Sequence, residues 1–226
     1  MTSLPRAVVF DLDGTLVDSI EDIAASMNVS LATVGRPGHD LATYRRFVGD
    51  GLRALAARAA AGADEATIDR VVASFRAHYG DHLCDATRPY PGIPEMVRGL
   101  RAAGIRTAVL SNKPHDATRR LVSALFGDDA FDDVLGQLPG APTKPDPAPA
   151  RAQLARLGVR AEHAALVGDS EMDVATALSC GMWPVGVSWG FRSVATLREA
   201  GAAVVVDRAD ELPPLLLAHF ESGNAA

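Results

Sequence analysis

Cysteine, aromatic residues and lysine are all scarce in this chain of 226 residues. The two cysteines, Cys84 and Cys180, lie far apart, and we interpret both as small buried hydrophobic side chains rather than a disulfide or a catalytic thiol. Aromatic residues make up 5% of the sequence and form no stacking platform for nucleic acid. A formal net charge of −6 also argues against a nucleic-acid partner and favours small-molecule chemistry.

Long apolar runs are missing as well. No segment reaches the roughly 18 uninterrupted apolar residues of a membrane span. Residues 1–6 lead straight into a short apolar run, so we expect no signal peptide. We therefore expect a cytoplasmic protein with no membrane partner. The histidines lack metal-ligand spacing, and we assign no catalytic role to His39, His78, His82, His115 and His163.

Apolar residues nevertheless make up 48% of the chain, which is ample for a packed core. After residue 88, helical segments alternate with short apolar runs at residues 106–110, 133–135, 164–167, 183–187 and 203–206. Strands that alternate with helices form parallel sheets covered by helices on both faces. We therefore predict an α/β fold whose core domain comprises residues 1–16 and 88–226.

Residues 17–87 follow a different pattern, with one helical segment after another and no convincing strand. Apolar residues recur at three- and four-residue spacing after Ser19, which we predict to cap the first of these helices. Asp64 is predicted to cap a later helix that runs to about residue 83. A helical block of this size, directly after a first strand, predicts an inserted cap domain over residues 17–87.

Residues 8–16 contain the first strand and the turn after it. Three apolar residues precede Asp11, and Asp13 and Gly14 follow. The apolar run predicts a strand buried on both faces, whose carboxyl end would bring Asp11 to the ligand-binding edge of the sheet. Residues two apart in an extended chain project the same way, so we expect both carboxylates at one site. A divalent cation such as Mg²⁺ would offset their mutual repulsion.

Polar residues follow two further predicted strands, Ser111 and Asn112 after one and Asp169 after the other, with Asp173 shortly beyond. Lys144 lies in the loop before the helix that precedes the last of these strands. Taken alone, each has an ordinary structural explanation as a cap, a turn or a solvated lysine. Because parallel strands end at one edge of a sheet, we expect these groups to converge.

Such a set of residues suits phosphoryl transfer, which needs positioning and charge neutralisation. Asp11 would attack phosphorus and become an aspartyl phosphate, while Asp13 would protonate the leaving oxygen and then accept a proton from water. Mg²⁺ would be held by Asp11, Asp169 and the backbone carbonyl of Asp13. Lys144 and Ser111 would bind the remaining phosphoryl oxygens.

Four sequence blocks, FDLDGTLVDS, SNKP, KPDP and GDSEMD, resemble in this order the motifs of the haloacid dehalogenase superfamily. The resemblance covers nearly the whole chain and implies a Rossmann-like core, an inserted α-helical cap, Mg²⁺ dependence and an aspartyl-phosphate intermediate. By motif position it implies Asp11 as nucleophile, Asp13 as acid/base and Asp169 as metal ligand. Asp173 would support the metal through water or Lys144. The residues expected to bind phosphate or substrate are Thr15, Ser111, Asn112 and Lys144.

Three stretches are similar to phosphoglycolate phosphatases: residues 47–52, residues 90–92 and residues 189–190. Gly49 and Gly51 would let the cap backbone approach the substrate, or they only break a helix. One of the cap arginines Arg45, Arg46 and Arg53 would bind a substrate carboxylate, with Arg53 as the first candidate, unless these are surface side chains. The leading substrate is therefore 2-phosphoglycolate.

Other functions remain open at this stage. A β-phosphoglucomutase-like phosphotransferase would share all the catalytic residues, and phosphatases of sugar phosphates, nucleotides or pyrophosphate would share the mechanism. A phosphonate hydrolase would need a cap lysine, and neither lysine of the chain lies in residues 17–87. A phospho-accepting receiver domain of signalling proteins is disfavoured by the helical insert. We expect a small phosphorylated metabolite as partner and either a monomer or a homodimer.

Overall fold

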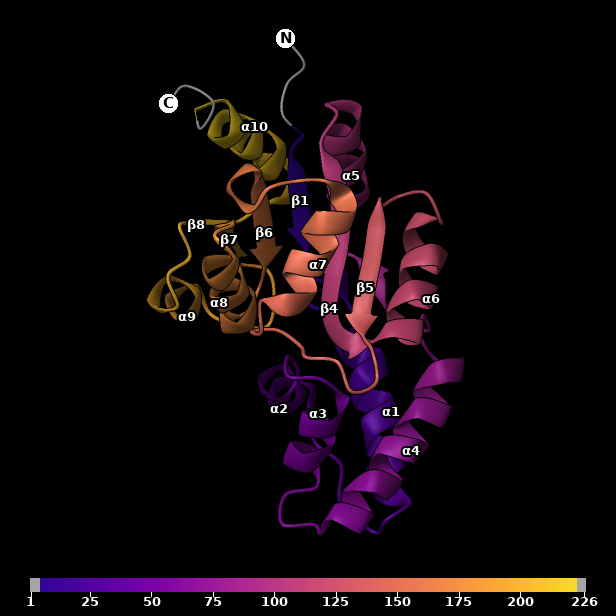
Figure 1. Cartoon of the computed structure of the whole chain (residues 1–226). Coiled ribbons are helices and arrows are strands. Elements are labelled where there is room, and N and C mark those ends of the chain that lie inside the picture. Colours follow the sequence, from indigo (N-terminus) through magenta and orange to yellow (C-terminus); the bar gives the residue numbers. More distant parts are fainter. Residues whose placement is uncertain (1–4, 223–226) are drawn as a thin grey trace.

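The computed structural model describes residues 5–222 and is built around a six-stranded parallel sheet (Figure 1). The order of the strands across the sheet is β5-β4-β1-β6-β7-β8. This arrangement confirms the predicted α/β fold with a Rossmann-like core. The strands are β1 (Ala7–Phe10), β4 (Arg106–Pro114), β5 (Asp133–Gln137), β6 (Ala164–Gly168), β7 (Trp183–Val187) and β8 (Val204–Val206).

Helices cover both faces of this sheet. Val8 and Phe10 of β1 belong to one apolar cluster and Ala7 and Val9 to another, and all four side chains are fully buried. Burial on both faces explains why this strand is a continuous apolar run rather than an alternating one. One face packs on α5 (Ile93–Ala102), α6 (His115–Phe126) and α10 (Leu212–Ser222), and the other on α7 (Ala148–Leu157) and α8 (Glu171–Cys180).

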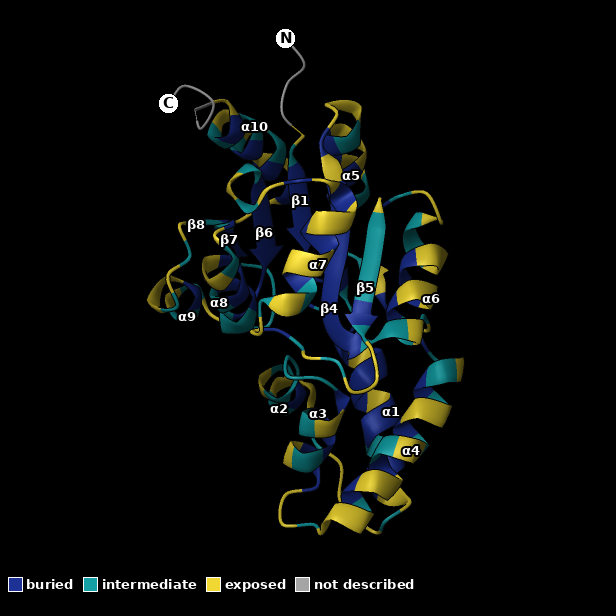
Figure 2. Ribbon diagram, in the orientation of Figure 1, coloured by how far each residue is buried: buried dark blue, intermediate teal, exposed yellow. Residues whose placement is uncertain are grey.

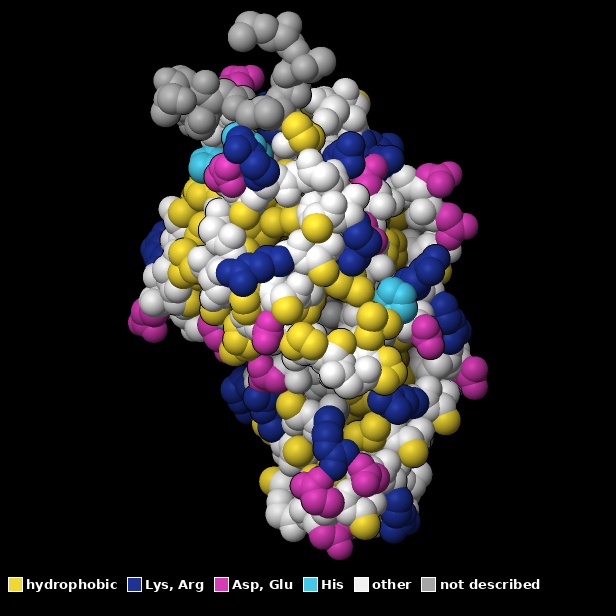
Figure 3. All heavy atoms as spheres, in the orientation of Figure 1, with side chains coloured by type: hydrophobic (Ala, Val, Ile, Leu, Met, Phe, Trp, Pro, Cys, Tyr) yellow, Lys and Arg dark blue, Asp and Glu magenta, His cyan; other side chains and the backbone are white. Residues whose placement is uncertain are grey.

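The remaining elements of the core are one short α-helix and two 3₁₀ helices. Helix α9 (Val194–Glu199) packs against β7 and β8, and two 3₁₀ helices, Ala161–His163 and Ala209–Glu211, precede β6 and α10. Figure 2 shows the central strands as a buried layer, with exposed residues on the outer sides of the helices. On the face drawn in Figure 3, charges of both signs are interspersed. No helix within residues 5–222 is long and apolar enough to cross a membrane.

Four helices between β1 and α5 form a separate layer, which we call the helical insert: α1 (Ile20–Ala32), α2 (Leu41–Phe47), α3 (Leu52–Ala59) and α4 (Glu65–Asp81). They pack around an apolar cluster of their own, which includes Met27, Leu31 and Tyr44. Figure 1 shows the helical insert beyond the arrowheads of the sheet, where the parallel strands end.

The segment that enters the helical insert and the segment that leaves it form a short two-stranded sheet. Strand β2 (Val17–Asp18) lies antiparallel to β3 (Arg88–Pro89), a short pairing that the sequence pattern did not predict. Next to it, the buried carboxylate of Asp22 accepts hydrogen bonds from the backbone N–H groups of Ala86 and Thr87 and from the Thr87 hydroxyl. These contacts tie the start of α1 to the segment that leaves the insert.

Ser19 and Asp64 both stand at the helix starts that the sequence predicts. Asp64 caps α4 as predicted, accepting a hydrogen bond of 2.8 Å from Thr67 N–H. Ser19 is the N-cap residue of α1 as predicted, but its hydroxyl makes no capping bond and instead donates to Asp13 Oδ1 at 2.6 Å. Cys84 and Cys180 are free thiols as predicted, but the prediction that both are buried was wrong, since both are partly exposed.

Candidate active site

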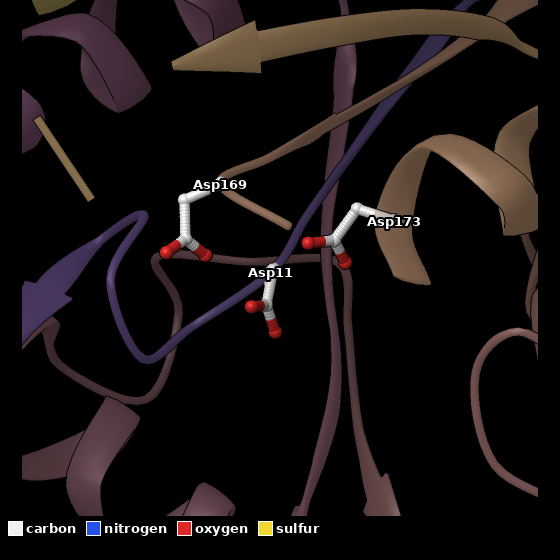
Figure 4. Close-up of side chains that lie close together, drawn as sticks. All are labelled: Asp11, Asp169 and Asp173. Carbon is white, nitrogen blue, oxygen red and sulfur yellow. The ribbon is translucent and has the colours of Figure 1, made fainter. Parts of the chain in front are cut away.

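Three neighbouring strands, β4, β1 and β6, deliver polar residues to one edge of the sheet. Asp11 directly follows β1, and its N–H donates to the Val167 carbonyl of β6 at 2.9 Å. Asp169 directly follows β6, and Asp173 lies in the first turn of α8. The three carboxylates point toward one another (Figure 4), with oxygens within 4.8 Å of one another. All three are buried.

Among residues 5–222, Lys144 is the cation that contacts this cluster of carboxylates. Its Nζ lies 2.7 Å from Asp11 Oδ1 and 2.6 Å from Asp173 Oδ1. Burial by itself lowers the pKa of Lys144, but the two carboxylates outweigh it and hold the pKa above its usual value, so the lysine is charged. Asp173 is further fixed by Ser170, whose N–H and hydroxyl donate to Oδ2.

The cluster contains three carboxylates for this one lysine, and the excess negative charge helps to raise the pKa values of Asp11 and Asp169. Burial, opposed by Lys144 and reinforced by Asp173, raises the pKa of Asp11 to about 7. Burial, reinforced by the negative charges of Asp11 and Asp173, raises the pKa of Asp169 to about 8. Buried carboxylate oxygens with excess negative charge suit a hard divalent cation. The residues at this sheet edge therefore fit such a metal.

Asp13 faces a different set of partners. Its carboxylate accepts from the Ser19 hydroxyl and lies 2.9 Å and 3.0 Å from Lys113 Nζ, measured to its two oxygens. The same ammonium lies over the ring of Tyr79 from α4, 4.7 Å from the centroid. Asp11 and Asp13 thus both border the site, but only Asp11 joins the carboxylate cluster.

The other predicted phosphate-site residues lie around these acids. The Thr15 hydroxyl donates to Asp169 Oδ1 at 3.3 Å. Asn112 donates to the carbonyls of Gly49 and Lys144 and accepts from Lys144 N–H, so its amide fastens the Lys144 loop. Ser111 is buried beside the site, and its hydroxyl oxygen accepts from Lys113 N–H at 3.3 Å.

A pocket with an empty volume of about 530 Å³, part of it open to solvent, lies between the sheet edge and the helical insert. Gly49 and Gly51 contribute to its wall, as does an apolar group from the insert that includes Leu52 and Phe75. Arg53 does not line it. Its guanidinium is exposed and pairs with Glu65 and Asp69 on the surface of the insert, so the structure separates this residue from the other candidates. The pocket wall consists of Asp11, Asp13, Ile23, Val48, Gly49, Gly51, Leu52, Leu55, Phe75, Tyr79, Ser111, Asn112, Lys113 and Pro114.

Comparison with known proteins identifies the family of this chain. A family model for haloacid dehalogenase-like hydrolases matches residues 5–181. The chain belongs to the haloacid dehalogenase-like hydrolases. It is 40% identical over 212 residues to the phosphoglycolate phosphatase of Rhodospirillum rubrum, an alignment that covers 90% of this chain and 88% of that protein. It is also 40% identical over 214 residues to the phosphoglycolate phosphatase of Cereibacter sphaeroides, covering 92% and 96% of the two chains.

A solved structure agrees with this family. A crystal structure from Lactobacillus delbrueckii subsp. bulgaricus, provisionally assigned as a phosphoglycolate phosphatase, superposes with a TM-score of 0.88 at 32% identity. The match covers 93% of this chain and 98% of that one. The prediction of an enzyme of the haloacid dehalogenase superfamily is therefore confirmed.

In this hydrolase, a loop after β7 supports Asp169 from the side. Phe191 N–H donates to Asp169 Oδ2 at 2.6 Å, and Trp189 Nε1–H donates to the Thr15 carbonyl at 3.0 Å. A Cβ at Gly190 would lie 2.2 Å from Asp169 Cβ, so only glycine fits there without movement. The loop therefore fixes the position of a carboxylate in the cluster.

The same loop also reaches the helical insert. The Arg192 guanidinium donates to the Arg45 and Val48 carbonyls, at 2.5 Å and 2.6 Å. Arg192 Nε also lies 3.3 Å from Glu171 Oε2 of α8. These bonds, together with the bond from Asn112 to Gly49, hold the loop between α2 and α3 against the site.

Sequence reasoning missed several residues that shape this site, among them Ser19, Lys113 and Tyr79. Ser19 and Lys113 stand inside the recognised blocks, and Lys113 is one of only two lysines in the chain, which was an available signal. Tyr79 gave no signal beyond the apolar periodicity of its helix. Its contact with Lys113 joins α4 to the end of β4, a proximity that only the tertiary fold creates.

Proposed function

We propose that this hydrolase is a Mg²⁺-dependent phosphatase of a small phosphate monoester, and that the substrate is 2-phosphoglycolate. The observation that carries the proposal is the buried cluster of Asp11, Asp169 and Asp173 with Lys144, beside the separate carboxylate of Asp13. Phosphoryl transfer needs charge neutralisation next to a nucleophile and a separate acid. The names of the relatives support phosphoglycolate as the substrate.

In the proposed mechanism, Asp11 attacks the phosphorus atom and forms an aspartyl phosphate. As the ester bond breaks, Asp13 gives its proton to the leaving oxygen. Asp13 then takes a proton from a water molecule that attacks phosphorus, which releases phosphate and restores the Asp11 carboxylate. Asp11, Asp169 and the backbone carbonyl of Asp13 would hold Mg²⁺, which would supply charge neutralisation at the phosphoryl oxygens. Lys144 and the Ser111 hydroxyl bind phosphoryl oxygens, and Asp173 positions Lys144.

We further propose that residues 17–87 act as a cap. The helical insert has an apolar cluster of its own, and the described contacts between it and the core include hydrogen bonds to backbone carbonyls. Closure would exclude bulk water while the acyl phosphate waits for its attacking water molecule. Solvent exposure of the pocket should therefore fall when a phosphate analogue binds, and hydrogen exchange that is equal with and without the analogue would contradict closure.

The pocket wall supports a small substrate over a sugar phosphate. The helical insert contributes the apolar side chains of Ile23, Leu52, Leu55 and Phe75 to this wall. Among the described lining residues from α1–α4, Tyr79 is the one with a polar side chain. Several sugar hydroxyls would lose hydrogen bonds to water against such a wall without replacement. This observation favours a phosphatase of a small acid over a β-phosphoglucomutase-like enzyme.

The proposal is tested by phosphate release across a panel of 2-phosphoglycolate, sugar phosphates, nucleotides and pyrophosphate. The assay compares Mg²⁺ with EDTA, and wild type with Asp11→Asn. We expect metal-dependent release that prefers 2-phosphoglycolate and is abolished by the substitution. Preference for another ester would overturn the substrate, and release that survives Asp11→Asn would overturn the mechanism.

A further inference from the structure

Two pocket residues have no role in the mechanism above: Lys113 at the end of β4 and Tyr79 of α4. Both are buried, with residue exposures of 7% and 3%. They come from opposite sides of the pocket, one from the core and one from the helical insert. The ammonium of Lys113 lies over the Tyr79 ring, so the two side chains meet where the insert covers the site.

Lys113 has hydrogen-bonding capacity left for a ligand. An ammonium carries three N–H donors, and its described acceptors are the two oxygens of Asp13. Burial by itself lowers the pKa of Lys113, but the adjacent Asp13 carboxylate holds the pKa above its usual value. The lysine is therefore a charged donor in a buried place.

The Tyr79 hydroxyl is a buried polar atom without a hydrogen-bond partner among residues 5–222. The ammonium of Lys113 lies over its ring, 4.7 Å from the centroid. Burial raises the pKa of Tyr79 to about 12, so the hydroxyl is neutral and keeps its proton. An unpaired buried donor is costly, and a bound acceptor would satisfy it.

The rest of the described pocket wall offers a carboxylate no second cation. Among the described lining residues, Lys113 is the one cationic side chain. Lys144 stands outside that lining and is engaged by Asp11 and Asp173. Arg53, the arginine proposed for a substrate carboxylate, pairs with acids on the surface of the insert.

We propose that Lys113 Nζ and Tyr79 Oη form a subsite for a carboxylate of the substrate, placed next to the phosphoryl group. This inference deepens the proposed function and rests on it for the identity of the acid. Lys113 would bridge Asp13 and the substrate carboxylate, and Tyr79 would donate from the cap. Because Tyr79 belongs to α4, the subsite is complete only when the helical insert covers the core.

The test measures binding without turnover. 3-Phosphonopropionate replaces the ester oxygen of phosphoglycolate by a methylene group, and its amide, 3-phosphonopropionamide, lacks only the negative charge of the carboxylate. Calorimetry in Mg²⁺ gives both Kd values for wild type, Tyr79→Phe and Lys113→Met. Arg53→Met is the matched control, because it removes an exposed cation of the insert that does not line the pocket.

We expect wild type to bind the acid about 10- to 100-fold more tightly than the amide, the range for hydrogen bonds to a charged group. Lys113→Met should bring this ratio close to one, and Tyr79→Phe should reduce it by roughly three- to tenfold. Arg53→Met should leave it unchanged. Tyr79→Phe removes a hydroxyl without a described partner, so its melting temperature should stay at or above that of wild type.

Two results would overturn the subsite. One is a wild-type ratio near one. The other is a Tyr79→Phe or Lys113→Met protein that binds both compounds more weakly but keeps the ratio, which would indicate a purely structural role. Failure of the proposed function looks different, because an enzyme that prefers the acid in calorimetry but does not hydrolyse 2-phosphoglycolate keeps the subsite and loses the substrate.

Discussion

Raising the pH should destabilise the metal-free protein, and Mg²⁺ should restore the lost stability. The pKa of Asp11 is about 7 and that of Asp169 about 8, against an ordinary value of 3.8. At a pH between the ordinary value of 3.8 and these raised pKa values, the folded protein holds protons that the unfolded chain has released. The stability is therefore fully present below about pH 4 and is lost as the pH rises through 7 to 8.

The size of this effect follows from the pKa of Asp11. A rise from 3.8 to about 7 corresponds to roughly 4 kcal/mol, at about 1.4 kcal/mol per unit. For a chain of this length, 1 kcal/mol shifts the melting temperature by about 2–4 °C. About two of these pH units lie between pH 5 and pH 8, so we expect the melting temperature in EDTA to fall by roughly 6–12 °C over that range. Mg²⁺ should raise it more at pH 8, where the carboxylates are ionised.

Thermal unfolding of three proteins tests this reasoning. Asp169→Asn removes one carboxylate of the cluster, so it should flatten the decline with pH and weaken the stabilisation by Mg²⁺. Asp69→Asn is the matched control, since this acid is exposed and pairs with Arg53 far from the cluster, and it should behave as wild type. Equal melting temperatures at pH 5 and pH 8 in EDTA, or a larger Mg²⁺ effect at pH 5, would refute the account.

Three further substitutions test how the site is held. Gly190→Ala places a Cβ 2.2 Å from Asp169 Cβ, so Mg²⁺ titrations of activity should show about tenfold weaker metal affinity. Arg192→Ala removes two hydrogen bonds to the helical insert, so steady-state kinetics should show KM about tenfold higher. Asp22→Asn weakens the bonds to Thr87 at the exit of the insert, so urea unfolding should show about 1–3 kcal/mol less stability. Unchanged values of these three quantities would contradict the respective contacts.

The carboxylate cluster could be predicted because it depends on topology that the sequence pattern encodes. Asp11 and Asp169 each follow a continuous apolar run, and such runs in an alternating pattern predict parallel strands that end at one edge. The structure places β1 and β6 side by side, which brings the two acids together. Lys144 lies in an irregular loop that strand topology does not place, so its grouping with these acids relied on its position before β6 and on the motif that the resemblance supplied.

The direction of side chains beyond the strand ends could not be predicted in this way. Strand β1 ends at Phe10, and Gly14 has φ +91°. Extended geometry therefore does not hold across this turn, and Asp13 faces Lys113 instead of the cluster. The register of β4 also shifts between Leu110 and Pro114, in the segment that contains Lys113. A period-two pattern cannot anticipate such a shift.

Side-chain contacts between distant segments could not be predicted from the sequence pattern either. Ser19 has the local signature of a helix cap, but a tertiary hydrogen bond to Asp13 uses its hydroxyl. Arg53 stands near the predicted specificity loop in sequence, yet the packing of α3 against α4 offers it Glu65 and Asp69 on the surface. Such outcomes depend on how helices pack, which their individual sequences leave open.

The central claim is that Asp11 takes the phosphoryl group from 2-phosphoglycolate. The most direct test mixes the enzyme with Mg²⁺ and substrate labelled in its phosphate, quenches with acid within milliseconds, and reduces the protein with borohydride. An aspartyl phosphate is reduced to homoserine, which mass spectrometry locates in the sequence. We predict labelled protein after the quench, homoserine at position 11, and neither in Asp11→Asn. Turnover of 2-phosphoglycolate with no labelled protein, or with homoserine elsewhere, would contradict the account.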